Sequence, residues 1–226
     1  MPKNPVSHVL LCSWVAYLLG VIVGDGTVYG GNKSSSSTAR HYRVSVYSNN
    51  REWLGRVCDV YEHIRDVHPA LSFSSRLVSM PAKNHYAVHV VDKSWHYHVV
   101  GEGIPVGKKS ACVGVPVRVV QRPELHLLFL SGYFDSDGGV SGRTIGWTSA
   151  SRELLADVQW MLSEQGVHSR LTSFTHSYNQ KEYFVLRVER AQASKFLKSL
   201  CLLNTQRRRK CFSHLRMCRS GQTGRL

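Results

Sequence analysis

Two stretches, LLGVIVGDG (residues 18–26) and LSGYFDSDG (residues 130–138), decide how this chain folds, because the second repeats the pattern of the first. Each stretch is an apolar run of helical character that ends in Asp-Gly. Small residues stand four positions apart within each run: Gly20 and Gly24 in the first, Gly132 and Ser136 in the second. Residues four apart share one face of a helix, and small side chains there allow two helices to approach closely. We therefore expect the two runs to form a pair of helices in direct contact.

The acidic residues before the closing glycines, Asp25 and Asp137, are expected at the same end of that helix pair. Two carboxylates forced together repel each other unless a divalent cation lies between them. The repeat thus predicts a metal site on a pseudo-twofold axis that relates the two halves of the chain. The residues directly before them, Gly24 and Ser136, belong to the same predicted site.

The charge of the chain favours a polyanionic partner. Its 226 residues include 29 Lys and Arg against 15 Asp and Glu, which gives a net charge of +14 spread along the whole length. Such an excess suits nucleic acid and a salt-dependent encounter. A basic protein without such a partner is the alternative from charge alone. With 42% hydrophobic residues, the chain can build a substantial core.

Neither export nor membrane insertion is expected. The apolar stretch from Val9 to Val23 is shorter than the roughly 20 residues of a membrane span, lacks a convincing cleavage site, and has a copy in mid-chain. No Cys-x-x-Cys pair occurs among the six cysteines, Cys12, Cys58, Cys112, Cys201, Cys211 and Cys218. We therefore expect an intracellular protein, cytoplasmic or associated with the nucleoid, although the sequence leaves a disulfide open.

Both motif stretches are followed by the same order of predicted elements. In the first half, alternation of apolar and polar residues predicts strands, with helices between and after them: strands at 27–33, 41–48, 72–80 and 85–91, a helix from Arg51 through Ile64, and a short helix at 95–100. The second half repeats this order with a hairpin at 140–148, a helix at 152–165 ended by Gly166, strands at 168–175 and 182–188, and a helix at 191–203. The order is helix-strand-strand-helix-strand-strand-helix, twice.

This order divides the chain into two repeats, at residues 1–103 and 124–206. The segment at 104–123 is rich in Gly, Pro and Lys and is interpreted as a linker. Residues 207–226 form a basic tail that begins Arg-Arg-Arg-Lys, for which a solvated arm and a phosphate contact are both open.

Two motif copies with matched downstream elements resemble the LAGLIDADG homing endonucleases of the single-chain, two-motif type known from archaeal introns. The resemblance covers roughly Trp14 to Leu203. It implies an α+β fold of two pseudo-symmetric αββαββα repeats, a saddle of two four-stranded antiparallel sheets with the paired motif helices at its centre. It also implies a monomer that binds a long asymmetric double-stranded DNA target and cuts both strands across the minor groove, leaving 3′ overhangs.

In this family the acidic residue before the closing Gly binds metal, which here means Asp25 and Asp137. Divalent ions held by carboxylates activate water and stabilise a leaving oxygen. Oxygen ligands without a His or Cys cluster favour Mg²⁺, or Mn²⁺ in its place. Asp135 stands at a motif position that usually caps or packs, so we do not expect it to be catalytic.

The family also places polar or basic residues around the metals. By match with the motif pattern, four basic residues are predicted to be catalytic: Arg51, Arg152, His89 and Arg187. Many relatives carry Gln at the positions of Tyr47 and Thr148 and Lys at the position of His89, so this chain departs from the common pattern. Arg51 and Arg152 as first-turn surface residues, and His89 as a plain surface histidine, are the alternatives.

Base readout is expected from the polar faces of the strands. An arginine that reads guanine contributes about 1–3 kcal/mol of discrimination, although each such residue is also a candidate phosphate contact. The predicted DNA-binding residues are Arg43, Ser45, Tyr47, Arg76, Arg143, Thr144, Thr148, Arg170 and Thr172.

The leading hypothesis is a site-specific, intron-encoded DNA endonuclease. An intein origin is disfavoured, because the chain begins with Met and lacks a closing His-Asn pair before Cys, Ser or Thr. An RNA-splicing maturase or a non-cleaving DNA-binding protein on the same fold is the alternative. Loss of a motif carboxylate would mark it, and both are present. A transcription regulator is disfavoured because too few residues follow Leu203 for a helix-turn-helix.

Overall fold

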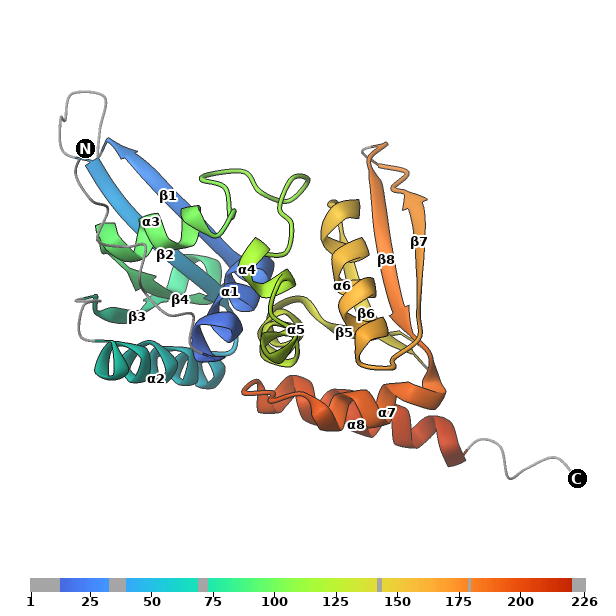
Figure 1. The fold of residues 1–226 in the computed structure, drawn as a ribbon. Helices are drawn as coiled ribbons and strands as arrows, with labels where there is room; N and C mark the ends of the chain where they lie inside the picture. The colour runs from blue at the N-terminus through green and yellow to red at the C-terminus, as the bar shows by residue number, and fades with distance from the viewer. Residues whose placement is uncertain (1–12, 33–39, 69–72, 142–143, 179, 221–226) are drawn as a thin grey trace, which may run out of the picture.

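Two motif helices lie side by side at the centre of the molecule, α1 (Ser13–Asp25) and α5 (Pro123–Asp137) (Figure 1). The structure is a computed structural model and describes residues 13–32, 40–68, 73–141, 144–178 and 180–220. A Cβ atom added at Gly20 would lie 2.7 Å from the backbone nitrogen of Tyr133, and one added at Gly132 would lie 2.9 Å from the carbonyl carbon of Tyr17. The two helix backbones are therefore in direct contact, as the repeated small residues predict.

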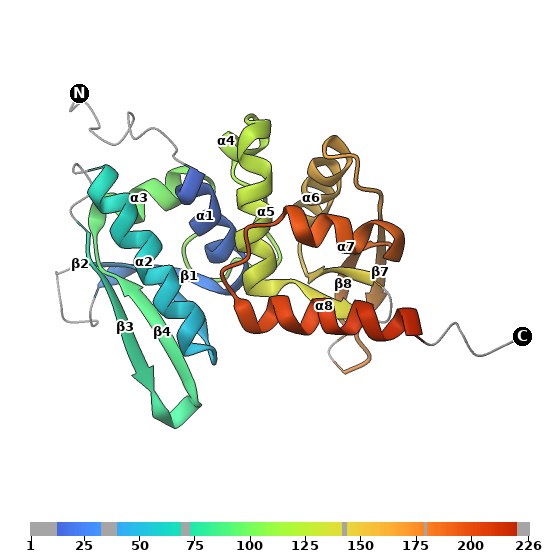
Figure 2. The same cartoon turned by 90° about the horizontal axis from the view of Figure 1, so that it is seen from below.

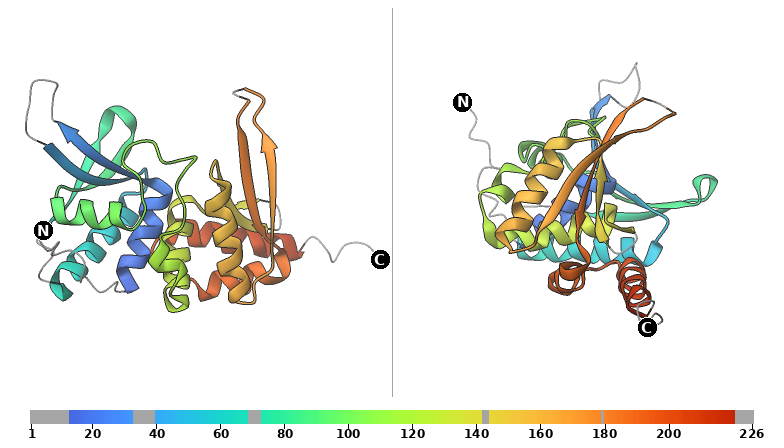
Figure 3. Two further views of the ribbon diagram at one scale, coloured as in Figure 1. Left: turned by 45° about the horizontal axis from the view of Figure 1, so that its top comes forward. Right: turned by 90° about the vertical axis from the view of Figure 1, so that its right-hand side faces the viewer.

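A four-stranded antiparallel sheet flanks each side of this helix pair. The first sheet has the order β1-β2-β4-β3, with strands β1 (Gly26–Asn32), β2 (Arg40–Ser48), β3 (Ser75–Met80) and β4 (His85–Val90). The second has the order β5-β6-β8-β7, with strands β5 (Gly139–Ser141), β6 (Thr144–Ser149), β7 (Ser169–Thr175) and β8 (Glu182–Val188). Figure 3 shows the hairpins β1–β2 and β7–β8 standing apart at the two ends of the molecule. The predicted fold class is confirmed.

Helices cover one face of each sheet, and the core lies between these layers. They are α2 (Arg51–Val67) and α3 (Lys93–Gly101) in the first half, and α6 (Arg152–Glu164) and α7 (Arg190–Ser199) in the second. The side chain of Asn50 accepts a hydrogen bond from the backbone of Trp53, and that of Ser151 from the backbone of Leu154, so both halves start their second helix with the same cap. Gly166, with φ of +67°, follows α6 as predicted.

Inward-facing strand residues alternate as the sequence indicates. Val44 and Val46 of β2 are buried, and so are Ile145 and Trp147 of β6. The other face of each sheet carries the polar residues and is left uncovered by α2, α3, α6 and α7 (Figure 1). That polar face is where the predicted DNA-binding residues stand.

The last predicted helix is shorter than expected. The helix predicted at 191–203 ends at Ser199, and residues 200–204 are extended. The reason is a tertiary contact: the backbone N–H groups of Leu203 and Asn204 both donate to the buried carboxylate of Asp135. A helix cannot use the same N–H groups for its own ladder.

The linker and the tail both contain helices. Helix α4 (Val117–Val120) lies within the segment predicted as a linker, and α8 (Thr205–Ser220) includes most of the predicted basic tail. A solvated arm was one interpretation of that tail. The structure instead buries Cys211 and Leu215 of α8, and burial of apolar side chains stabilises a helix that is otherwise strongly basic.

None of the helices in the described part of the chain has the length and apolar character needed to cross a membrane. Among the cysteines that the structure describes, Cys58, Cys112, Cys201 and Cys211 are free.

Candidate functional site

The two motif carboxylates stand at the ends of α1 and α5, where these helices touch. A Cβ atom added at Gly24 would lie 2.8 Å from the Cβ of Ser136 and 3.2 Å from the Cβ of Asp137. The glycine therefore permits the close approach of the helix ends. Burial of the Asp25 carboxyl, followed by the neighbouring Asp137 carboxylate, raises the pKa of Asp25 to about 6. The two carboxylates therefore repel each other.

The pKa of Asp137 is also raised, because the surrounding protein displaces water from its carboxyl group. Two cations act in the opposite direction on both carboxyl groups. They are Arg207 and Lys109, and each lowers the pKa of Asp25 and of Asp137. The site is thus a carboxylate pair flanked by two positive charges.

Lys109 comes from the segment between the repeats. Its Nζ donates a hydrogen bond to the carbonyl oxygen of Gly24 at 2.8 Å and another to the carbonyl oxygen of Val23. These carbonyls belong to the last turn of α1 and have no partner within the helix. Desolvation lowers the pKa of Lys109 to about 8, although Asp137 and Asp25 favour its charged form.

Arg207 comes from the first turn of α8. Its Nη1 donates to the carbonyl oxygen of Phe134 at 3.1 Å and to that of Gly138. These two carbonyls flank Asp137 along the chain, so Arg207 fixes the C-terminal end of α5 as Lys109 fixes that of α1. The two cations occupy corresponding places on the two motif helices.

Sequence reasoning missed both cations. The basic residues of the linker and the tail were visible, but nothing in their spacing shows that these segments fold back to the motif ends. Only the tertiary path of 104–123 and of α8 brings them there.

The donor set fits a hard divalent cation. In the part of the chain that the structure describes, no group of three or more His, Cys, Asp and Glu side chains is arranged to hold a metal. The carboxylates of Asp25 and Asp137 and the backbone carbonyl of Ser136 offer oxygen alone, which suits Mg²⁺ or Mn²⁺ with retained waters. The carbonyl of Gly24, the other predicted backbone ligand, accepts a hydrogen bond from the ammonium of Lys109 in this structure. The hydroxyl of Ser136 donates to the carbonyls of Gly132 and Tyr133, both at 3.1 Å, so a metal would meet only the backbone oxygen of Ser136.

Asp135 has a structural role, as expected. It is fully buried, and its Oδ2 accepts hydrogen bonds from the hydroxyl of Tyr17 at 2.7 Å and from the backbone N–H groups of Leu203 and Asn204. Burial raises its pKa to about 6, although these hydrogen bonds oppose the shift. Asp135 therefore joins α1, α5 and the segment before α8, and it is closed to substrate.

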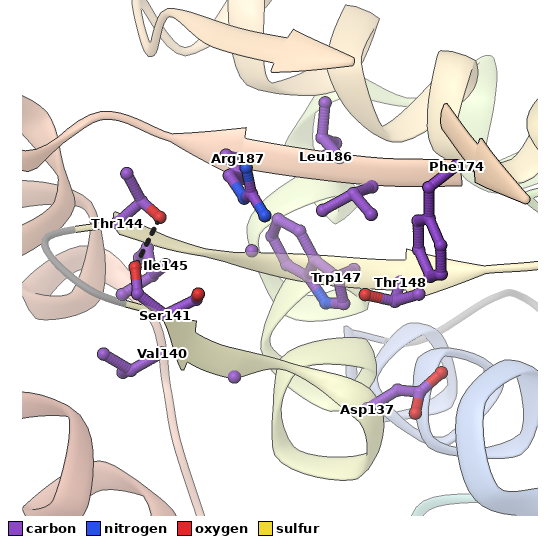
Figure 4. A pocket seen from close by; sticks show the side chains of 13 residues that line it. Asp137, Val140, Ser141, Thr144, Ile145, Trp147, Thr148, Phe174, Leu186 and Arg187 are labelled. Atoms are coloured by element: carbon purple, nitrogen blue, oxygen red, sulfur yellow. Dashed lines mark hydrogen bonds between the residues drawn. The ribbon is translucent and has the colours of Figure 1, made fainter. Parts of the chain in front are cut away.

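A groove of about 340 Å³ crosses the polar face of the second sheet, and Asp137 stands at one end of it. Figure 4 shows Asp137 at the end of α5, with Thr148 and Phe174 on the same side of the pocket, Arg187 on β8, and Ser141 and Thr144 on the opposite side. The groove connects a predicted metal ligand with the predicted catalytic Arg187 and with Thr148 on one continuous surface. Thr144 also lines it, but its hydroxyl donates to the carbonyl of Ser141 at 2.8 Å.

The polar face of the first sheet is more tightly organised. Nδ1 of His89 lies 2.9 Å from the hydroxyl of Ser45, which is only 2% exposed. The guanidinium of Arg43 lies 5.6 Å from the ring centroid of Tyr29, and the ring of Tyr47 meets that of His89 edge to face. Ser45 thus orients His89, and its burial is a difference from the expected base contact.

The register of the two sheets places His89 and Arg187 at equivalent positions, as the sequence repeat predicts. His89 pairs with Ser45 on one side and Arg76 on the other. Arg187 pairs in the same way with Gly146 and Arg170.

Four of the other predicted residues are exposed. Arg51 and Arg152 are the exposed first residues of α2 and α6. Arg76 and Arg170 are exposed on the outer part of each sheet, while Thr172 donates to the carbonyl of Val185 at 3.4 Å. Arg143 lies outside the described residues.

Comparisons with known protein families and solved structures find relatives with the same fold. A family model described as a LAGLIDADG-like domain matches residues 124–201. The chain also matches a structure of mesophilic variants of the homing endonuclease I-DmoI, with a TM-score of 0.67 and 19% identity, over 88% of this chain and 97% of that one. Residues 124–201 thus match a LAGLIDADG-like domain, and the chain as a whole has the fold of the LAGLIDADG endonucleases. The predicted family resemblance is confirmed.

Two further structures share the LAGLIDADG fold. I-DmoI in complex with DNA and Mn matches with a TM-score of 0.67 at 18% identity, over 83% of this chain and 96% of that one. The LAGLIDADG meganuclease I-AabMI bound to uncleaved DNA matches with a TM-score of 0.53 at 12% identity, over 93% and 92%. At such identities the likeness establishes the fold.

The curated relatives that the chain matches in sequence are longer proteins, and the chain matches only a part of each. The DNA gyrase A subunit of Mycobacterium kansasii is 28% identical over 191 residues, which are 82% of this chain and 31% of that protein. The DNA gyrase A subunit of Mycobacterium gordonae is 36% identical over 100 residues, 42% of this chain and 18% of that protein. The replication factor C small subunit of Methanocaldococcus jannaschii is 32% identical over 78 residues, 34% of this chain and 4% of that protein. The chain spans less than a third of the length of each of these relatives.

Proposed function

We propose that the chain is a site-specific endonuclease that hydrolyses both strands of double-stranded DNA. The observation that carries the proposal is the carboxylate pair, Asp25 and Asp137, at the touching ends of α1 and α5, midway between two sheets with polar faces. One carboxylate from each half, placed on the pseudo-twofold axis, suits two reactions on opposite strands.

Metal dependence belongs to the proposal. Asp25 and Asp137 would hold the divalent ions, Mg²⁺ or Mn²⁺, together with backbone oxygens of the adjacent residues. Bound ions supply an activated water and stabilise the leaving oxygen. Solved LAGLIDADG structures that resemble the chain contain Mn or Mg with target DNA, and this supports divalent ion use here.

The chain's own residues have distinct parts in this reaction. Lys109 and Arg207 hold the ends of the motif helices and offset the negative charge of the pair. Arg187 and His89, at equivalent places on the two sheets, are positioned to hold the backbone of the strand being cut. Arg51 and Arg152 are the first residues of α2 and α6, equivalent positions in the two halves, and would assist the reaction from the protein surface.

The two halves offer different side chains at equivalent sheet positions, and this supports a long asymmetric target. Where the first sheet has Arg43 and Tyr47, the second has Thr144 and Thr148. A single chain that holds both halves would act as a monomer inside the cell, where its DNA lies. Staggered cuts that leave 3′ overhangs complete this proposal.

In our proposal the chain is encoded within an intron. A segment embedded in a longer protein is the second candidate, favoured by the small share of each gyrase relative that the chain spans.

The test is cleavage of a randomised double-stranded library by purified protein with Mg²⁺, followed by sequencing of the cut ends. We expect one long asymmetric site with staggered cuts. Asp25→Asn and Asp137→Asn should each abolish double-strand cleavage while binding in Ca²⁺ survives. Asp66→Asn, which changes an exposed carboxylate on α2, is the matched control and should cut normally. Full cleavage by either motif variant, or cleavage with chelator present, would refute the proposal. Retained binding of structured RNA without any DNA cleavage would favour the maturase alternative.

A further inference from the structure

A second groove lies where α8 meets both halves of the molecule. It has a volume of about 270 Å³, and its walls include Asn49 after β2, Gly139 and Val140 of β5, and Arg207 and Lys210 of α8. Figure 2 shows α8 running from the ends of the motif helices along the second half. The groove is therefore lined by both repeats and by the basic helix.

This groove continues the one that contains the predicted metal ligand. Gly139 and Val140 line both grooves, so the two meet along β5. A ligand that follows the polar face of the second sheet past Asp137 would arrive between Asn49 and α8.

The groove is held open by contacts that fix α8. The side-chain amide of Asn50 donates to Oδ1 of Asn204 at 3.0 Å and to Oε1 of Gln206 at 3.2 Å, which ties α8 to the start of α2. Arg207 donates to the end of α5, and Cys211 with Leu215 is buried. These inward contacts fix the rotation of the helix, and Arg208, Arg209 and Lys210 face outward.

The exposed side of α8 carries positive charges and no negative one. Arg208, Arg209 and Lys210 are exposed, and residues 205–220 include no acidic residue. Within the described residues, the ammonium of Lys210 makes no hydrogen bond or ion pair. The acidic residue beside the start of α8, Glu52, is engaged by Arg56 at 3.0 Å and by the hydroxyl of Thr205. The motif carboxylates face Arg207, whereas at Lys210 a phosphate would meet a positive charge without a carboxylate partner in the described residues, together with the side-chain amide of Asn49.

We propose that the groove between α8 and Asn49 binds the phosphodiester backbone of the target duplex on the flank beside the cut. Lys210 supplies the charge, and Asn49 supplies an amide donor from the other half. Amides and lysines are common phosphate contacts, which position a duplex without reading its sequence. This inference rests on the proposed function, and it assigns the basic segment after residue 206 to the DNA interface.

The test compares Lys210→Gln with Lys195→Gln in duplex binding, measured by fluorescence anisotropy in Ca²⁺ over a series of salt concentrations. Lys195 is exposed on α7, whose Phe196 packs against the inward-facing Trp147. Both variants remove one positive charge. Loss of one phosphate contact lowers the slope of log affinity against log salt by about 0.9 and weakens binding about fivefold at 0.15 M salt. We expect that change for Lys210→Gln alone, equally on target and unrelated duplex.

Ethylation of single phosphates provides the second measurement. In the unmodified protein, ethylation at a position beside the cut should interfere with binding, and Lys210→Gln should lose that interference. The inference is overturned if both variants have the same slope, or if Lys210→Gln weakens binding of structured RNA but not of duplex DNA. Cleavage by the unmodified protein in Mg²⁺ is measured in parallel. If Lys210→Gln lowers the salt slope but the unmodified protein does not cleave DNA, the proposed nuclease function is refuted and the phosphate site is kept. If the unmodified protein cleaves DNA but Lys210→Gln leaves the salt slope unchanged, the phosphate site is refuted and the nuclease function is kept.

Discussion

Replacement of Gly132 by Ala tests the contact on which the site depends. Gly132 lies on α5 where its backbone touches α1, and an added Cβ would lie 2.9 Å from the carbonyl carbon of Tyr17 and closer still to its oxygen. Real Cβ atoms essentially never come within 3.0 Å of such atoms. Since the obstructing atoms belong to the backbone, no side chain can rotate away. The helices must separate, by roughly 1 Å, to remove the overlap.

The cost follows from the packing. Overpacking a tight core costs about 1–3 kcal/mol, and a clash between two backbones belongs at the upper end or above. For a chain of this length, about 3 kcal/mol corresponds to a fall in Tm of roughly 6–12 °C. Separation also moves Asp25 away from Asp137 and Gly24 away from Ser136, so divalent-ion binding should weaken together with stability.

Gly55→Ala is the matched control. Gly55 lies in α2, and a Cβ added there meets nothing within 4 Å. The same substitution should raise stability by up to about 1 kcal/mol, because Ala favours the helix. Thermal unfolding with and without Ca²⁺ measures both effects. If Gly132→Ala keeps the Tm and the Ca²⁺ response of the unmodified protein, the motif helices do not touch as described and cannot bring their carboxylates into a shared site.

Three further perturbations follow from the electrostatics of the site. Because the pKa of Asp25 is raised to about 6, its protonation stabilises the metal-free fold at low pH, and that contribution is lost as pH rises through about 6. Asp25→Asn should therefore stabilise the metal-free protein at pH 8 by about 1–3 kcal/mol after allowance for partial exposure, and by roughly half as much at pH 5, where the carboxyl is ionised in the unfolded chain but still mostly protonated in the folded one. Ca²⁺ should raise the Tm of the unmodified protein at pH 8 but not at pH 5. Destabilisation by Asp25→Asn at pH 8, measured in denaturant, would contradict both. Arg207→Gln should move the pH midpoint of metal-dependent cleavage upward, since Arg207 lowers the pKa of Asp25 and Asp137; a downward shift in the pH–rate profile would count against the assignment. Tyr17→Phe should cost about 1–3 kcal/mol in chemical denaturation, since it removes the hydroxyl donor to buried Asp135, and an unchanged denaturation midpoint would show that this bond contributes nothing.

Much of the fold was predictable from local pattern. Strand alternation predicts Val44 and Val46 on the inner face of their sheet, where both are buried. The repeat added long-range information, because two copies of a small-residue motif are expected to pack against each other. For that reason the contact of α1 with α5, and the position of Asp25 beside Asp137, were accessible without coordinates.

The end of α7 and the structure of the tail were not accessible in this way. Residues 200–203 have a sequence that continues a helix, yet they are extended because Asp135 captures two of the backbone N–H groups. The basic run after residue 206 reads as a solvated arm until the burial of Cys211 and Leu215 is known. In both places a distant partner outweighs the local preference.

The sequence by itself determined the helix pair, the two sheets and the paired carboxylates, since each is encoded by periodicity or by repetition. Only the tertiary structure decided which cations surround the carboxylates. Lys109 and Arg207 lie far from both motifs in the chain and reach the motif ends through folded connections. The sequence position of a charged residue does not show which distant group it will contact. Lys109 in the linker and Arg207 in the tail therefore reach the carboxylates only through the packing of the segments that carry them.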